Sequence, residues 1–211
     1  MPKGVYLFGG YGSKTTSDFL PKFKKFWQVG PTIPDNGING GCGVRISNTE
    51  FVLIGGYDSR NLVIKYNTET QEWTTMHNLI RGRYDHACAK INQNIIVSGG
   101  RDFNNKILSS TEIIPLISFQ PRLAENGNLN IPRTLFGILA VGGTFPRILA
   151  LGGLKSIPHL NLNSRIDHKI KTIEVWNEDD EVWTEAPFQM KHGRYDFGYL
   201  ALPESTICKN N

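Results

Sequence analysis

The sequence predicts an all-β protein built from about four repeats of one strand-rich unit. Its 22 glycines and 11 prolines supply enough punctuation for many short strands and turns. Four short apolar runs each end in a pair of glycines. Short apolar runs bounded by turn residues are typical of buried strands, and their recurrence indicates a repeat architecture.

The glycine pairs set the period of the repeat. They begin at Gly9, Gly55, Gly99 and Gly152, so successive pairs lie 46, 44 and 53 residues apart. Glycine adopts positive φ without a steric penalty, which lets the chain leave a strand in a crowded place. We therefore expect each apolar run to be a buried strand and each pair to be its exit.

Aromatic residues recur in phase with the glycines. Tyr66 and Trp73 lie seven residues apart across a polar turn, as do Trp176 and Trp183. This pattern predicts a hairpin in both units. Trp27 follows the first glycine pair at the same spacing as Trp73 follows the second. We expect the tryptophans at these positions to be buried between units.

A third signal precedes the next unit. The segment Gly-Arg-Tyr-Asp occurs at residues 82–85 and again at 193–196, and Pro132-Arg133 matches it more loosely. Because Arg83, Arg133 and Arg194 recur with the repeat, we expect them to hydrogen-bond loop carbonyls rather than to contact a ligand.

Taken together, these features resemble kelch repeats over nearly the whole chain. In that family each unit is a four-stranded meander that forms one blade of a β-propeller. The resemblance implies a kelch-type β-propeller of about four blades of four antiparallel strands, with a C-terminal strand completing the first blade. The third unit departs from the pattern because it lacks both aromatic residues.

The phase of the repeat predicts a single propeller domain over residues 1–211. We name the strands of a blade A to D from the centre outward, so that a glycine pair ends strand B. The predicted blades are residues 1–34 with 196–204, then 41–76, 83–124 and 134–187, and residues 205–211 are expected to be a disordered tail. The first blade lacks strand A, which residues 197–202 would supply, and the ring would then close as a monomer. Both a complete four-bladed ring and a fragment of a larger kelch protein remain open.

Composition limits the compartment and the partners. The net charge is +4 with no block of lysine and arginine, so nucleic acid is not an expected partner. No apolar run approaches the ~18 residues of a membrane helix, so no membrane is expected either. Three cysteines form no disulfide framework, which favours a cytoplasmic location. Cys42 and Cys88 are expected to pack as small residues near the propeller axis.

The candidate binding residues lie in loops at one end of the blades. In an antiparallel meander the B–C and D–A loops emerge at the same end. Tyrosine and arginine are enriched at interface anchors, and a basic loop suits an acidic peptide motif of a protein partner. The candidates are Tyr11, Lys14, Tyr57, Arg60, Tyr84, Asp85, Arg101, Phe103, Lys155, Arg165 and Tyr195.

Three functions remain open. The first is a protein-protein interaction module; the resemblance implies a ubiquitin-ligase substrate receptor without its BTB part, or actin binding. The second is a small metal-dependent enzyme at the propeller mouth that uses His159 or His168, which rests on fold analogy. The third is a degenerate fragment without a ligand. Zinc-ligand spacings and nucleophile motifs are absent from the sequence, so we expect no enzyme, no metal and no cofactor.

Overall fold

The structure is a computed structural model that describes residues 4–142, 146–155 and 168–199. No described residue is helical, which agrees with the all-β prediction. The strands are β1 (Gly4–Phe8), β2 (Ser17–Pro21), β3 (Gln28–Val29), β4 (Cys42–Arg45), β5 (Glu50–Ile54), β6 (Val63–Asn67), β7 (Glu72–Thr75), β8 (Ala87–Ile91), β9 (Asn94–Ser98), β10 (Thr111–Pro115), β11 (Arg122–Leu123), β12 (Gly137–Val141), β13 (Arg147–Leu151), β14 (Thr172–Asn177) and β15 (Val182–Gln189).

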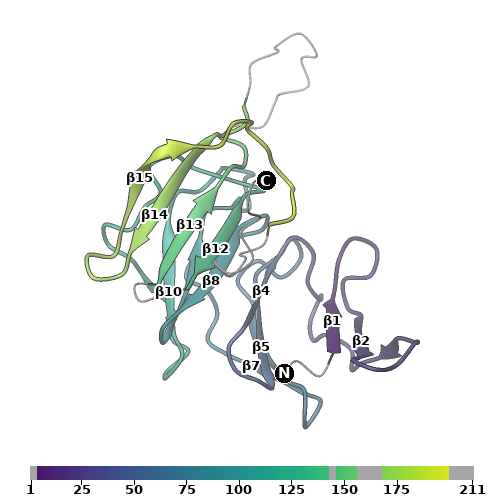
Figure 1. The fold of residues 1–211 in the computed structure, drawn as a ribbon. Helices are drawn as coiled ribbons and strands as arrows, with labels where there is room; N and C mark the ends of the chain where they lie inside the picture. The colour runs from purple at the N-terminus through teal and green to yellow at the C-terminus, as the bar shows by residue number, and fades with distance from the viewer. Residues whose placement is uncertain (1–3, 143–145, 156–167, 200–211) are drawn as a thin grey trace.

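The strands form four antiparallel meanders, which agrees with the predicted number of blades. The first blade is β1-β2-β3, the second β4-β5-β6-β7, the third β8-β9-β10-β11 and the fourth β12-β13-β14-β15. Strand β8 lies against both β4 and β12, so the A strands face the centre. Figure 1 shows the sheets as an open arc, with the first blade at one end and the fourth at the other.

The predicted closing strand is not present in the described residues. The first blade has three strands, and residues 197–199 are not in a strand. The rest of the predicted strand, together with the tail 205–211, lies outside the described residues. Phe197 lies against Gly152 and Tyr199 against Gly137, so this segment packs on the fourth blade. It does not pair with β1 over its described part.

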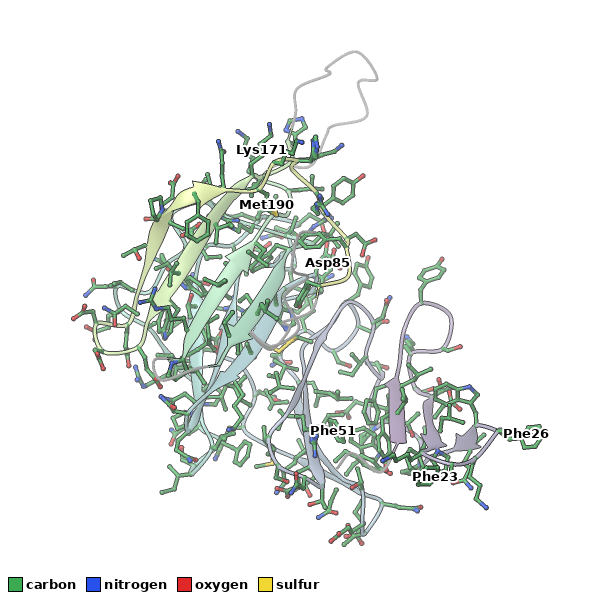
Figure 2. All side chains as sticks on the ribbon, in the orientation of Figure 1. Phe23, Phe26, Phe51, Asp85, Lys171 and Met190 are labelled. Carbon is green, nitrogen blue, oxygen red and sulfur yellow. A yellow bond between two sulfur atoms is a disulfide. The ribbon has the colours of Figure 1, made fainter. Side chains whose placement is uncertain are left out.

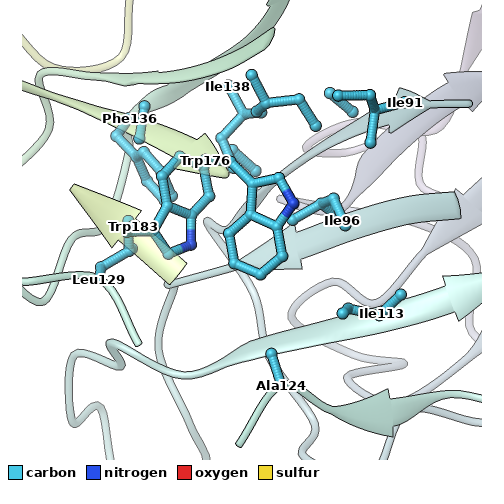
Figure 3. Packing of buried hydrophobic residues seen from close by; sticks show 13 residues of the cluster. Ile91, Ile96, Ile113, Ala124, Leu129, Phe136, Ile138, Trp176 and Trp183 are labelled. Atoms are coloured by element: carbon cyan, nitrogen blue, oxygen red, sulfur yellow. The ribbon is translucent and has the colours of Figure 1, made fainter. Parts of the chain in front are cut away.

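The core between the third and fourth blades is built around the predicted aromatic pair. Trp176 and Trp183 are cross-strand partners with ring centroids 5.3 Å apart, and both are buried. The indole of Trp183 donates a hydrogen bond to Thr111 Oγ1 at 3.0 Å. Figure 3 shows these rings packed with Ile96 and Ile113 of the third blade. Burial of each large apolar side chain contributes about 1.5–3 kcal/mol, so this cluster holds the two blades together.

The prediction for Trp27 is wrong, whereas Trp73 is partly buried as part of the core. Trp73 packs on Tyr66 at 4.6 Å, and Phe8 of the first blade meets its edge at 5.7 Å. Trp27 remains 47% exposed. It precedes the two-residue strand β3 at the end of the arc, where no further blade covers it. Figure 2 shows nearby Phe26 pointing outward at the same end.

The glycine pairs leave their strands with positive φ, as predicted. Gly55 has φ of 60° and Gly99 has φ of 64°. A Cβ at Gly99 would lie 2.7 Å from the carbonyl oxygen of Arg133, so glycine is required by the close approach of the next linker. The backbone amides of Gly56 and Gly100 then donate to the carbonyls of Arg83 and Arg133. Strand-B exits and D–A linkers therefore lie on one face.

Two of the three repeated arginines are fully buried. Arg83 donates to the carbonyls of Gly99 and Ser110 at 3.0 and 2.9 Å, which confirms the structural prediction. Its guanidinium also binds the carboxylate of Glu112 at 2.8 Å, with both side chains 0% exposed. Burial lowers the pKa of Arg83, and Glu112 opposes that shift. Arg133 binds Glu174 in the same way in the fourth blade.

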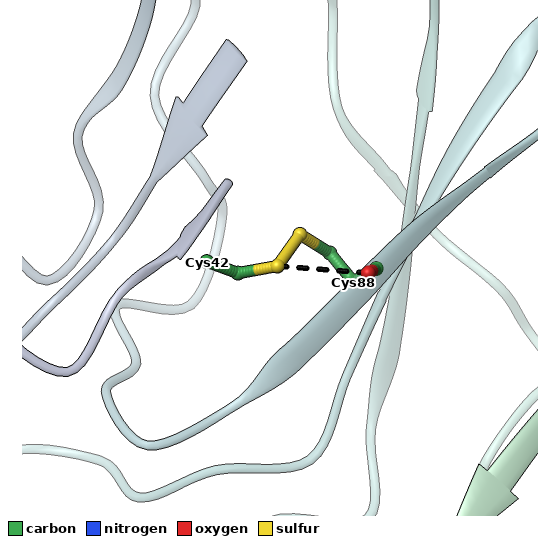
Figure 4. Close-up of a disulfide and its surroundings, with 2 residues drawn as sticks. All are labelled: Cys42 and Cys88. Carbon is green, nitrogen blue, oxygen red and sulfur yellow. Dashed lines mark hydrogen bonds between the residues drawn. A yellow bond between two sulfur atoms is a disulfide. The ribbon is translucent and has the colours of Figure 1, made fainter. Parts of the chain in front are cut away.

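The prediction of unpaired cysteines is wrong. Cys42 on β4 and Cys88 on β8 form a disulfide with their Cα atoms 6.0 Å apart (Figure 4). Their placement beside the axis agrees with the expectation that they pack there, but the bond joins the second blade to the third. Since β4 and β8 are the innermost strands of these two blades, the disulfide links the blades at the centre of the arc.

Candidate functional site

Four aromatic and basic side chains meet where the second and third blades adjoin. Tyr57 and Arg60 lie in the B–C loop of the second blade, Tyr84 in the linker that follows, and Phe103 in the B–C loop of the third blade. The amide of Tyr57 donates to the carbonyl of Asn39 at 2.6 Å, which fixes the loop at its start. We call Tyr57, Arg60, Tyr84 and Phe103 the arginine–aromatic cluster.

The guanidinium of Arg60 is the centre of this cluster. Its carbon lies 5.1 Å from the ring centres of Tyr57 and Tyr84 and 4.3 Å from that of Phe103. The Tyr57 and Tyr84 rings also meet edge-on at 5.1 Å. Arg60 Nη1 donates to the carbonyl of Asp102 at 3.2 Å, which ties the two loops together. Cation–π contacts and hydrogen bonds thus hold the arginine in one orientation.

The cluster has an exposed side and a buried side. Phe103 is 74% exposed and Tyr57 is 51% exposed, whereas Tyr84 is 6% exposed. The Tyr84 hydroxyl hydrogen-bonds the side-chain oxygen of Asn105. A second guanidinium, that of Arg101, lies 5.7 Å from the Tyr84 ring. The buried tyrosine therefore supports a surface of two aromatic rings.

Asp85 lies beside the cluster at the centre of the molecule (Figure 2). Arg101 Nε is 3.7 Å from its carboxylate and donates to Thr134 Oγ1 at 3.1 Å. Burial raises the pKa of Asp85, Arg101 lowers it, and the charge of Asp196 raises it further. Asp85 and Asp196 both line the hollow at the axis.

A small hollow marks the axis on this face. Its volume is about 190 Å³, and one pair of consecutive residues from each of four linkers lines it. The lining pairs are Gly40 and Gly41, Asp85 and His86, Leu135 and Phe136, and Asp196 and Phe197. A second hollow of about 560 Å³ lies at the opposite end, between the A–B turns of the third and fourth blades and the C–D turn of the fourth. None of the predicted binding residues lines that second hollow.

Tyr11, Lys14, Lys155 and Tyr195, which the structure describes, do not join the arginine–aromatic cluster. Tyr11 is 96% exposed, and Lys14 forms a 3.1 Å ion pair with Asp58 across the first two blades. Lys155 and Tyr195 are exposed on loops of the fourth blade. Arg165 lies outside the described residues.

Metal-binding geometry is not found in the described part of the chain. There, no group of three histidine, cysteine, aspartate or glutamate side chains could hold a metal ion. His168 is described, while His159 lies outside the described residues. The described residues also include no helix long and apolar enough to cross a membrane.

Sequence reasoning missed several residues that shape the site. Asn105 and Thr134 bind Tyr84 and Arg101, but nothing about an isolated asparagine or threonine distinguishes them. Glu112 and Glu174 did carry a signal, since each follows a Ser or Thr by two residues in phase with a repeated arginine.

Comparison with known proteins gives distant relatives that include several kelch-like proteins. No family model matches the chain. Kelch-like protein terF of Aspergillus terreus is 34% identical over 96 residues, which are 40% of this chain and 21% of that protein. Kelch-like proteins 9 and 13 of Mus musculus are each 29% identical over 118 residues, which are 52% of this chain and 18% and 17% of those proteins.

The chain therefore spans about a fifth of the length of the curated relatives it matches. The glycine-pair repeats and the antiparallel blades of this chain are the features expected of kelch repeats. The chain is thus similar to kelch-like proteins over about half of its length, a distant match that supports a kelch-repeat relationship.

Proposed function

We propose that the chain is a protein-interaction module that binds a peptide or loop of a partner through its B–C/D–A face. The observation that carries the proposal is the arginine–aromatic cluster. Phe103 and Tyr57 expose large rings around a guanidinium held in place by Tyr84. Rigid aromatic and arginine side chains are the residue types that most often dominate binding energy at protein interfaces.

The partner segment we propose is acidic. Arg60 and Arg101 present positive charge beside the exposed rings, and Arg101 is neutralised only in part by Asp85 at 3.7 Å. An Asp or Glu side chain of the partner would reach Arg60 while its neighbours cover Phe103. Complementary charge of this kind chiefly increases the association rate and the specificity.

From the resemblance to kelch repeats, we propose a protein selected for ubiquitin ligation as the partner, with actin as the competing candidate. The cytoplasm is the proposed location. A disulfide between Cys42 and Cys88 would argue against this location, because cytosolic thiols are kept reduced and disulfides persist in oxidising compartments. Trapping the thiols in intact cells would find both cysteines free if this location is right.

A random peptide library displayed on phage tests the proposed face. Selection on the whole chain should enrich peptides that contain Asp or Glu next to an apolar residue. The double variant Tyr57→Ala with Phe103→Ala should weaken binding of a selected peptide by at least about tenfold, as expected for hot-spot residues.

Ile117→Ala is the matched control, because Ile117 is 94% exposed in the C–D turn at the opposite end of the third blade. This variant should leave peptide binding unchanged. Selected peptides without acidic residues, or equal loss in the control and the double variant, would refute the proposed face.

A further inference from the structure

The linker arginines occupy a niche that recurs in the blades. Arg83 follows the second blade, and its side chain enters the third, where it binds the carbonyls of Gly99 and Ser110, the hydroxyl of Ser110 and the carboxylate of Glu112. Its own carbonyl accepts a hydrogen bond from Gly56 of the second blade. Each such arginine therefore joins one blade to the next.

The fourth blade repeats these four contacts of the arginine Nη1 and Nη2 atoms. Arg133 binds the carbonyls of Gly152 and Thr172, the hydroxyl of Thr172 and the carboxylate of Glu174. The niche is thus a strand-B glycine carbonyl followed, at the start of strand C, by Ser or Thr, any residue, and an acid.

The second blade lacks both halves of the interaction. The position equivalent to Arg83 is Ile38, whose carbonyl accepts from the amide of Gly10. The positions equivalent to Ser110 and Glu112 are Leu62 and Ile64, and all three apolar side chains lie in one buried cluster. Arginine and acid are therefore present together or absent together in these three blades.

The first blade has the niche without an arginine. The amide of Gly9 donates to the carbonyl of Thr16, as Gly99 does to Ser110, so Thr16 and Asp18 occupy the positions of the hydroxyl and the acid. In the described structure the Asp18 carboxylate has no ion pair or hydrogen bond.

After the fourth blade the chain has an arginine without a niche. The carbonyl of Arg194 accepts from the amide of Gly153, which is the relation of Arg83 to Gly56. Its guanidinium is exposed and has no partner among the described residues.

We propose that Arg194 docks into the Gly9–Thr16–Asp18 niche and so closes the arc into a four-bladed ring. Hydrogen bonds between successive linkers support closure of the fourth blade onto the first. Asp85 donates its amide to Gly40, Leu135 to Asp85, and Asp196 to Leu135, at 2.6, 2.9 and 2.9 Å. Residues 196 and 197 and residues 40 and 41 line one hollow of about 190 Å³. The place of the next blade after the fourth is therefore that of the first.

A zero-length cross-link tests this contact. In the variant Arg194→Lys, a carbodiimide should condense the Asp18 carboxylate with the new amine, forming an amide as the carbodiimide takes up water to become a urea. Mass spectrometry of the monomeric fraction should find position 18 joined to position 194, and Asp18→Asn should abolish this link. A link found only in a dimer would assign the niche to a second copy, and no link in either fraction would overturn the proposal.

A double-mutant cycle on proteolysis provides a second measurement. Asp18→Asn and Arg194→Ile should each speed cleavage within the first blade by about tenfold, and the double variant should add little, because coupled groups are not additive. Lys191→Ile is the matched control, since it removes one positive charge from an exposed position in the same linker. Additive effects, or an equal effect of the control, would contradict the docking of Arg194.

Discussion

Removal of the charge of Glu112 should destabilise the protein far more than an exposed substitution would. The Arg83 guanidinium is 0% exposed and would lose its only countercharge among the described residues. The amides of Ile80 and Arg81, which donate to the Glu112 carboxylate at 2.8 and 3.0 Å, would keep only a neutral acceptor. Breaking a buried ion pair in this way costs about 3–5 kcal/mol. That is a large part of a typical stability of about 5–15 kcal/mol.

The molecule itself supplies the comparison. The second blade fills the same space with Ile38 and Ile64, so Arg83→Ile combined with Glu112→Ile copies an arrangement that already folds. The double variant should lose less stability than the two single variants summed, by at least about 2 kcal/mol. Its remaining loss comes from backbone groups that no longer have side-chain partners.

Urea unfolding followed by tryptophan fluorescence measures these losses. With an m-value of about 2 kcal/mol per M, Glu112→Gln should lower the midpoint by about 1.5–2.5 M. Ile117→Ala serves again as an exposed control and should move it little. The reasoning would be refuted by a loss below about 1 kcal/mol in Glu112→Gln, or by strict additivity in the double variant.

Two further predictions concern the disulfide and a buried histidine. Cys42 and Cys88 are 46 residues apart, for which chain entropy gives about 4 kcal/mol, so complete reduction should lower Tm by about 8–16 °C; an unchanged Tm with both thiols labelled would contradict this. Burial lowers the pKa of His86 to about 3 from 6.5, so the stability it contributes as a neutral ring is present above pH 6.5 and is lost as pH falls towards 3. His86→Phe copies Phe136 of the next linker and has no group that titrates here. Between neutral pH and pH 5, wild type should therefore lose about 2 kcal/mol of unfolding free energy that the variant keeps. Equal acid denaturation curves for the two proteins would exclude this.

The sequence predicted the repeating parts of the fold because they depend on contacts within one unit. Tyr66 and Trp73 lie opposite each other across a hairpin, so their spacing along the chain already determines their contact. The exposure of Trp27 depends instead on whether another blade covers the first, which no local pattern reports.

The cysteine pairing shows a signal that was present but not used. Cys42 and Cys88 are separated by 46 residues, which is close to one repeat, so both fall on the inner strands of neighbouring blades. They are one register position apart rather than equivalent, since Cys42 lies opposite Ile54 and Cys88 opposite Val97. Inner-strand residues about one repeat apart lie side by side at the axis of such a molecule.

For the candidate site, residue types and the shared loop end were predictable from topology. Which side chains meet was not, because the position of Arg60 depends on the carbonyl of Asp102 in the neighbouring blade.

The hydrophobic clusters become smaller toward the N-terminus, and this gradient has a dynamic consequence. The first blade contributes Phe8 to its shared cluster, while its Val5 and Leu7 remain 53% and 52% exposed. In repeat proteins each unit is held mainly by its neighbours, so the most weakly packed terminal unit opens most often. Backbone amides of β1 and β2 should exchange with solvent long before those of β9 or β13. The arginine–aromatic cluster belongs to the second and third blades, so a bound partner would contact the slowly exchanging part of the molecule and remain undisturbed when the first blade opens.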